Sequence, residues 1–324
     1  MDEKTVTYSV AIRTLGTGGE KFREELLSIS RQTIRPDKVV VYIAEGYPRP
    51  EFTIGEEEYV WVPKGMMAQR ILPYDEIESE LILMLDDDVR LAPDTAEKLI
   101  EALEENKVDC VGADVFKNHL MPFGMKLKAA VSDFVFPHLS RKWAFKVRRN
   151  GSFSYNLKPE PRYYSSQSAA GPVQLWKKQS FRNLHLSDEL WLDSLGFPFA
   201  EDRLMTYKLF LSGGTLGVHY GSGVENLDGG TSSGSFKKSP EWVRVRTKAS
   251  FMVWWRMCYR NGKDTPWTRF LAASAFAVKS LWMLFVMAGL SMARLSPGIL
   301  SSYIKGFREA ARLCSKGFVP RVFS

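Results

Sequence analysis

Three consecutive carboxylates, Asp86-Asp87-Asp88, are the residues of this chain best suited to chemistry. They follow the apolar run Leu81–Leu85, which predicts a buried strand that ends at the edge of a sheet. Adjacent carboxylates repel one another unless a cation neutralises them, and alternate ones such as Asp86 and Asp88 can converge on one divalent ion. Mg²⁺ and Mn²⁺ bound in this way take their other ligands from water and substrate phosphates. The alternative is a solvated turn before the next helix.

A second acidic motif, Glu201-Asp202-Arg203, opens a predicted helix. A carboxylate here can remove the proton of an attacking alcohol if it lies within hydrogen-bond reach. The alternative is structural, because acidic residues in a first turn oppose the helix dipole favourably. Arg70 has a guanidinium suited to a diphosphate, and Glu45 can accept a hydrogen bond from a base or ribose, although both could equally be ordinary surface residues.

These side chains need a framework that brings them together. Strands are predicted at 8–14, 38–43, 59–62 and 81–85, and helices at 20–32 and 93–105, which indicates an α/β layer with a mostly parallel sheet. Ligands of such sheets bind beyond the carboxyl ends of the strands, where Thr14, Glu45 and Asp86–Asp88 fall. A further strand is predicted at 171–176 and a helix at 201–211. Residues 117–170 are basic and aromatic, and predict an insert outside the core.

Composition excludes several protein classes. The chain has 324 residues, 45% hydrophobic and 25% charged, which excludes general disorder. Its three cysteines include no Cys-x-x-Cys, which excludes a disulfide scaffold and a cysteine zinc site. No apolar secretory segment follows Met1, so we expect the protein to stay on the cytosolic side.

The charge is distributed unevenly along the chain. The net charge is +7, but residues 237–324 hold 16 Lys and Arg against three acidic residues, a net +13, together with five of the nine Trp. A basic, Trp-rich tail on an acidic body predicts an anionic partner. The adjacent apolar runs favour an anionic membrane surface over nucleic acid, which we do not expect as a partner.

The C-terminal region contains two predicted helices. Residues 270–290 are apolar and, as one helix, would span about 31 Å, enough for a bilayer core. Lys279 would then lie near the middle, at a cost of about 2.5–3.5 kcal/mol. Residues 299–316 have an apolar face opposite Lys and Arg, which is typical of a helix in the membrane interface. We expect interfacial attachment, with one spanning helix or a soluble helical subdomain as the alternatives.

The order and spacing of these motifs resemble the family 2 glycosyltransferases, which have the GT-A fold. Ser9–Thr14 and Leu27–Pro36 resemble the first strand and following helix end of that family, and Leu85–Val89 resembles its metal-binding D-x-D strand end. Ala200–Arg203, ahead of Gly213-Gly214, resembles the motif that holds the catalytic base, especially the Glu-Asp-Arg of chitin and hyaluronan synthases. The resemblance covers residues 8–228.

The resemblance implies a GT-A catalytic domain over residues 1–236. Composition predicts a basic insert over 117–170 within it and a helical membrane-associating region over 237–324 after it. The resemblance also implies that the divalent cation is Mg²⁺ or Mn²⁺ and that the transfer is inverting. The implied nucleotide-sugar residues are Thr14, Glu45, Arg70, Asp86 and Asp87; the metal ligands are Asp86 and Asp88; the base is Asp202, with Glu201 and Arg203 on the acceptor side.

The sequence departs from the family pattern at three places. Glu45-Gly46 stands where Asp-Asp-Gly is usual, and Asn226 stands where a His often follows the acidic helix. The Gln-x-x-Arg-Trp motif of processive synthases does not occur. The missing motif favours transfer of a single sugar to a hydroxyl acceptor, such as a lipid-linked or cell-surface glycan precursor. From the basic tail we expect a peripheral or monotopic protein on the cytoplasmic face of the membrane.

Two other functions fit part of the pattern. A sugar nucleotidyltransferase would need a glycine-rich loop with a basic residue after the first strand, for which only Gly16–Gly19 is a candidate, and it leaves Glu201-Asp202 unexplained. A membrane scaffold with a degenerate transferase domain would not need Asp86, Asp88 and Asp202, all of which are present.

Overall fold

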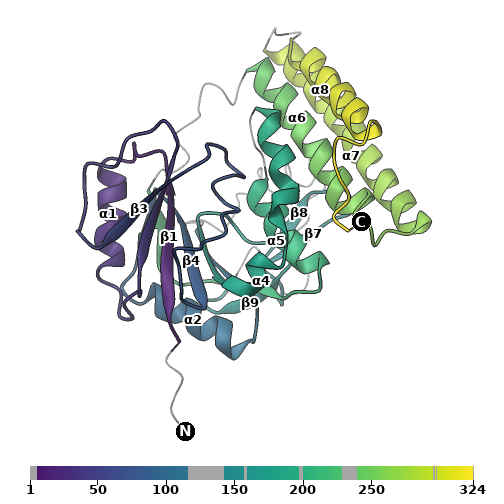
Figure 1. The fold of residues 1–324 in the computed structure, drawn as a ribbon. Coiled ribbons are helices and arrows are strands. Elements are labelled where there is room, and N and C mark those ends of the chain that lie inside the picture. Colours follow the sequence, from purple (N-terminus) through teal and green to yellow (C-terminus); the bar gives the residue numbers. More distant parts are fainter. Residues whose placement is uncertain are drawn as a thin grey trace.

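The computed structural model describes residues 6–115, 142–156, 159–196, 200–227, 239–294, 296 and 298–323. Strands and helices alternate through the first half, and three long helices close the chain (Figure 1). The strands are β1 (Tyr8–Thr14), β2 (Val39–Ala44), β3 (Glu57–Val62), β4 (Leu81–Asp86), β5 (Val89–Leu91), β6 (Cys110–Ala113), β7 (Phe145–Val147), β8 (Phe153–Tyr155), β9 (Tyr163–Ser166), β10 (Val173–Lys177), β11 (Leu216–His219) and β12 (Val224–Asn226). The helices are α1 (Glu20–Ile29), α2 (Thr95–Glu105), α4 (Lys178–Arg182), the 3₁₀ segment η1 (Leu186–Leu195), α5 (Glu201–Leu211), α6 (Pro240–Trp254), the π-helical turn η3 (Trp255–Tyr259), α7 (Pro266–Ala293) and α8 (Gly298–Ser315).

The main sheet has eight strands in the order β3-β2-β1-β4-β10-β6-β11-β9. Strands β3, β2, β1 and β4 are parallel neighbours, and β10 and β9 run antiparallel to the strands beside them. The predicted α/β fold with a mostly parallel sheet is therefore confirmed. The carboxyl ends of β1 and β4 lie together, because Arg13 is paired in register with Asp86.

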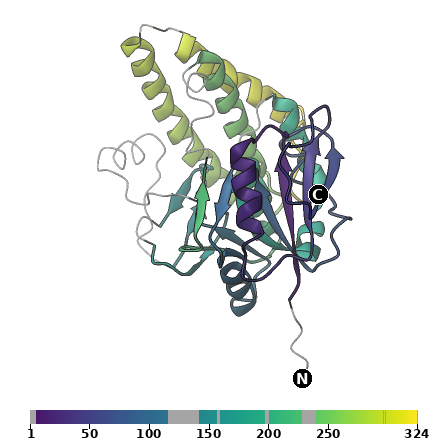
Figure 2. The same ribbon diagram turned by 90° about the vertical axis from the view of Figure 1, so that its left-hand side faces the viewer.

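Both faces of the sheet are covered, which explains why its central strands read as continuous apolar runs. Every residue of β1 and β2 is buried. Helices α1 and α2 contribute to the hydrophobic cluster on one face, and α5 with the C-terminal helices contributes to the cluster on the other (Figure 2). The C-terminal helices therefore share a core with the sheet.

The predicted insert over residues 117–170 is only partly separate from the core. Residues 116–141 lie outside the described residues. Farther along, β9 pairs antiparallel with β11 and forms one edge of the main sheet, and Tyr164 in that strand is buried. Strands β7 and β8 form a separate hairpin. Low periodicity concealed β9 because an edge strand of four residues is too short to show a clear pattern.

Three helices form a C-terminal lobe, α6 to α8. Both predicted helices are present, as α7 and α8, and both α6 and α7 begin with capped turns. The Ser239 hydroxyl accepts from the Trp242 amide, and Thr265 and Thr268 form a capping box ahead of α7. The interfacial role expected for residues 299–316 stays a prediction, but it does not account for the whole apolar face of that helix. The apolar face of α8 packs against α6, and Gly306 lies so close to the Arg244 backbone that a Cβ would clash.

A fully buried ion pair joins this lobe to the sheet domain. Arg256, in the π-helical turn η3, binds Glu189 of η1 through two hydrogen bonds, one of them Nε to Oε2 at 2.6 Å. Lys208 of α5 forms a second ion pair with Glu189, with its Nζ 3.1 Å from Oε1. The Trp191 indole donates a hydrogen bond to the same carboxylate. Burying these charges is tolerated because each is paired and hydrogen-bonded.

We expect Arg256→Met to lower the free energy of unfolding by about 3–5 kcal/mol, because it leaves Glu189 buried with less compensation. Chemical denaturation measures this loss. The double variant Glu189→Gln/Arg256→Met should lose clearly less, since no carboxylate is then stranded. A loss below about 1 kcal/mol in the single variant would show that this ion pair does not hold the lobe to the sheet domain.

Candidate functional site

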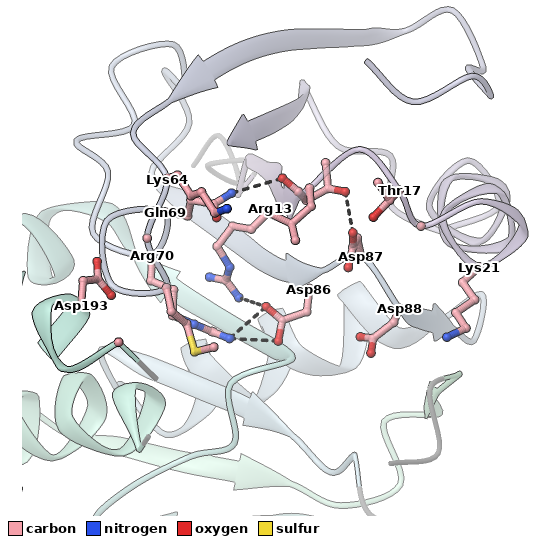
Figure 3. A pocket seen from close by; sticks show the side chains of 16 residues that line it. Arg13, Thr17, Lys21, Lys64, Gln69, Arg70, Asp86, Asp87, Asp88 and Asp193 are labelled. Carbon is pink, nitrogen blue, oxygen red and sulfur yellow. Dashed lines mark hydrogen bonds and ion pairs between the residues drawn. The ribbon is translucent and has the colours of Figure 1, made fainter. Parts of the chain in front are cut away.

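A pocket of about 860 Å³ opens at the carboxyl ends of β1 and β4 (Figure 3). Of the residues predicted for the site, Thr14, Arg70 and Asp86–Asp88 line it. Three further cations, Arg13, Lys21 and Lys64, line it as well. The pocket therefore combines acidic and basic side chains, an arrangement suited to a ligand with negative charges and a cation of its own.

Asp86 is held by two arginines. Arg13 Nη2 donates to Asp86 Oδ1 at 2.7 Å, and Arg70 Nη2 lies 3.1 and 3.0 Å from the two carboxylate oxygens. Burial acts to raise the pKa of Asp86, but Arg70 and then Arg13 more than offset it, so the pKa is lowered. Asp86 is therefore a satisfied carboxylate, and its oxygens face guanidinium groups.

The next two aspartates have other surroundings. Thr14 Oγ1 donates to Asp87 Oδ2 at 2.5 Å and accepts from the Gly16 amide at 2.8 Å, which ties Asp87 to the loop after β1. Asp88 lies in the turn between β4 and β5 and is partly exposed in the pocket. Figure 3 shows its carboxylate on the same side of the pocket as Lys21. Consecutive residues thus have different partners.

A fourth carboxyl group, Glu25 of α1, is buried near this acidic strand end. It is fully buried, and neither carboxylate oxygen has a hydrogen-bond partner among the described residues. Burial, and then the charges of the acidic strand end with Asp87 foremost, raise the pKa of Glu25 well above its ordinary value. Both effects favour the neutral form of the Glu25 carboxyl group. Nothing in the helical pattern of α1 distinguished it from a surface glutamate.

The second acidic motif meets the pocket at Arg70. Glu201 Oε1 lies 3.6 Å from Arg70 Nη2, and the Gly171 amide donates to Asp202 Oδ2 at 3.2 Å. A Cβ on Gly171 would lie 2.9 Å from Arg70 Nη1 and 3.0 Å from the Asp202 Cβ, so a side chain at this position would crowd the place where the two motifs meet. Burial, and then the neighbouring Asp202, raise the pKa of Glu201. The two acidic motifs, 115 positions apart in sequence, thus share one guanidinium.

Two predicted residues lie elsewhere. Glu45 is exposed after β2 and does not line the pocket. Arg203 lies over the Phe153 ring of β8, with its guanidinium carbon 3.9 Å from the ring centroid. Arg203 is therefore near Asp202 but faces the β7–β8 hairpin.

Sequence reasoning missed Asp193, which holds the loop that carries Arg70. Its carboxylate accepts from the Met67 amide at 2.8 Å and from the Ala68 amide at 2.9 Å. The following residue, Gln69, donates from Nε2 to the Thr14 carbonyl at 3.2 Å. Asp193 lies in the 3₁₀ segment η1, where no motif singles it out. A carboxylate that binds two consecutive amides fixes the loop, and with it the position of Arg70.

The acidic residues of the pocket could hold a divalent cation together with a bound ligand. They fit less well a metal site made of protein side chains alone. Among the described residues, no group of three His, Cys, Asp or Glu side chains is placed to bind a metal. Asp88 and Asp87 offer hard oxygen donors at the pocket, whereas both oxygens of Asp86 face arginines. Mg²⁺ is commonly bound by one or two carboxylates together with substrate phosphates, and this donor set fits that pattern.

Comparison with known proteins shows that the fold of this chain resembles a solved structure. No protein-family model matches this chain, and no curated protein matches it in sequence. Among solved structures, it is similar to GalNAc-T7, whose crystal structure contains UDP, GalNAc and Mn²⁺, with a TM-score of 0.52 and 13% identity. The match covers 85% of this chain and 56% of that one, so this chain spans about half the length of its neighbour. The mixed, mostly parallel sheet flanked by helices is like the GT-A fold.

We expect Asp193→Ala to speed amide hydrogen exchange at Met67 and Ala68, because both amides lose their acceptor. Hydrogen bonds to charged groups contribute about 1.5–3 kcal/mol each, so the loop should open at least tenfold more often. Asp188→Ala removes an exposed carboxylate from the same segment and is the matched control. Equal exchange in the two variants would show that Asp193 does not hold the loop.

Proposed function

We propose that this protein is a metal-dependent, inverting glycosyltransferase that moves one sugar from a nucleoside-diphosphate donor to a hydroxyl acceptor. The observation that carries the proposal is the meeting of two acidic motifs at Arg70: Asp86 from the strand end and Glu201 from the start of α5. This arrangement supports a donor site next to a proton acceptor. The likeness to GalNAc-T7, solved with UDP and Mn²⁺, supports the same assignment.

The donor would occupy the pocket at the carboxyl ends of β1 and β4. Its volume, about 860 Å³, lies within the usual range of ligand sites, about 300–1,000 Å³. Arg13, Lys21, Lys64 and Arg70 supply positive charge for the two phosphates. Arg13 Nε is buried without a hydrogen-bond partner in the described part of the chain, so it would reach a phosphate oxygen only if the Arg13 side chain turned into the pocket.

Thr14 and Asp87 would lie on the nucleoside side of this site, where their hydrogen bond shapes the first loop. We keep Glu45 as a proposed contact to the base or ribose. Because Glu45 does not line the pocket, the nucleoside would have to extend beyond it to make this contact.

Asp88 would hold the divalent ion, with Asp86 joining it only if Arg13 or Arg70 turns toward the phosphates. When bound, Mg²⁺ or Mn²⁺ supplies charge that stabilises the diphosphate as it leaves. Arg70 adds to this stabilisation from the protein side. The charge of Arg70 is fixed in place by Asp86 and by the loop that Asp193 holds.

Asp202 would accept the proton of the acceptor hydroxyl. The hydroxyl oxygen forms the new bond to the anomeric carbon as the bond from that carbon to the diphosphate oxygen breaks, which inverts the configuration. Gly171 orients Asp202 through its amide. Glu201, buried beside Arg70, would orient the acceptor together with Arg203.

The acceptor would be a glycan precursor carried on a lipid, and the protein would work as a peripheral or monotopic enzyme on the cytoplasmic face of a membrane. The basic C-terminal region, with its net charge of +13, supports an anionic membrane surface as partner. One helix of the lobe, α7, is by length and composition apolar enough to cross a membrane, which supports an apolar partner for this region.

We expect Asp88→Ala to abolish the enhancement of nucleotide binding by Mn²⁺ without unfolding the protein, because losing one of three adjacent carboxylates relieves repulsion. Titration calorimetry with UDP and GDP, each with and without Mn²⁺, measures this. Asp94→Ala, an exposed carboxylate at the start of α2, is the control. Metal-dependent binding that persists in Asp88→Ala would remove Asp88 from the metal site.

We expect Asp202→Asn to bind donor normally and to lose turnover about 10²–10⁴-fold, because the amide is nearly isosteric but cannot accept a proton. Glu201→Gln should lose less. Turnover at saturating donor, measured beside nucleotide affinity, separates the two roles. A dead Glu201→Gln beside an active Asp202→Asn would reverse them, and activity in both would end the proposal that this motif is catalytic.

A further inference from the structure

The six most exposed large apolar side chains in the part of the chain that the structure describes all lie on α7. They are between 53% and 71% exposed: Trp267, Phe270, Val278, Leu281, Phe285 and Met292. At about 100° per residue, these positions fall in a single stripe about 100° wide along the helix. Figure 1 shows α7 on the outer side of the lobe. Monomeric soluble proteins rarely leave such a continuous apolar surface without a partner.

The opposite face of α7 is already occupied. Phe276 is buried and stacks on Trp254 of α6, with ring centroids 3.9 Å apart. Tyr303 of α8 donates from its hydroxyl to the Ser280 carbonyl at 3.0 Å. Lys279 Nζ lies 3.4 Å from the Asn150 carbonyl, which fixes the middle of α7 to the turn of the β7–β8 hairpin. The buried Phe276 and the exposed stripe therefore lie on opposite sides of α7.

By length and composition, α7 could cross a membrane, with a mean hydropathy of 1.8 over its most apolar window. Its packing argues against this orientation. A spanning α7 would take α6 and α8 into the hydrocarbon core, at about 2.5–3.5 kcal/mol for each Arg, Lys or Asp at the centre. The two helices together carry eight charged residues: Glu241, Arg244, Arg246, Lys248, Lys305, Arg308, Glu309 and Arg312.

We propose that the exposed stripe of α7 docks on an anionic lipid bilayer, with the helix axis in the plane of the membrane. The charge of the C-terminal region identifies the kind of lipid, since each Lys or Arg near an anionic surface contributes about 1 kcal/mol. Trp267 begins the stripe and is a residue type enriched at the membrane interface. This inference rests on the membrane location proposed above, but not on the transfer reaction.

Docking in this way orients the enzyme. In both ribbon views, β1 starts near the N-terminus and the lobe lies at the far end of the molecule, toward which the carboxyl ends of the parallel strands point (Figures 1 and 2). The candidate site opens at those carboxyl ends. The lobe that carries the stripe therefore lies at the end of the molecule that holds the site, which suits an acceptor anchored in lipid.

The test is co-sedimentation of the full chain with vesicles of phosphatidylcholine containing 30% phosphatidylglycerol. We expect wild-type protein to bind these vesicles, and binding to fall as salt rises. The double variant Leu281→Glu/Phe285→Glu should partition at least tenfold more weakly with an unchanged melting temperature, since both side chains are exposed. Trp61→Glu, which changes an exposed side chain of the edge strand β3, is the matched control and should bind as wild type.

Three results would overturn the inference. The first is a double variant that binds vesicles as well as wild type. The second is wild-type protein that ignores vesicles but dimerises through α7 in light scattering, which would assign the stripe to a second copy. The third is resistance of the bound protein to extraction at alkaline pH, which would indicate a spanning helix. Nucleotide binding is measured on the same variants. If vesicle binding fails but nucleotide binding is intact, the docking proposal is wrong and the proposed function stands. If nucleotide binding fails but vesicle binding is intact, the proposed function is wrong and the docking proposal stands.

Discussion

The guanidinium of Arg70 is the interaction on which the rest of the candidate site depends. It lies between Asp86 at the end of β4 and Glu201 at the start of α5, at 3.0 and 3.6 Å. Without a buried cation there, carboxylates from two elements would face one another in a partly dehydrated pocket, which is unfavourable. A side chain at position 171 would crowd the same contact. An incoming diphosphate would compete with Asp86 for this group, so donor binding would rearrange the site.

One short segment, η1, connects that cation to the C-terminal lobe. At one point it holds the loop of Arg70 through Asp193, and four residues earlier it pairs Glu189 with Arg256 of the lobe. Both carboxylates have little conformational freedom, because Asp193 binds two amides and Glu189 is fully buried. The loop that carries Arg70 and the C-terminal lobe are thus held by adjacent turns of one segment.

The sequence predicted the sheet, the strand that ends in Asp86–Asp88 and both C-terminal helices, because long apolar runs and abrupt acidic ends are strong local signals. The pairing of Asp86 with Arg13 could not be predicted, since it depends on the register of β1 against β4. Asp193 lacks any local signal. An amphipathic pattern shows that α8 has an apolar face but not what covers it, which is why its packing on α6 was only one of the alternatives that the sequence left open.

The central claim is that this pocket binds a nucleoside diphosphate together with a divalent cation. The most direct measurement is the melting temperature of the full chain with UDP or GDP, each with Mn²⁺ or with chelator, beside the matching monophosphates. A ligand that binds the native state raises the melting temperature. At a ligand concentration of a hundred times Kd, the native state is stabilised by about 2.7 kcal/mol. We expect at least one diphosphate to raise the melting temperature only when Mn²⁺ is present, and its monophosphate to raise it much less. No shift with either diphosphate, or equal shifts with and without the metal, would contradict it.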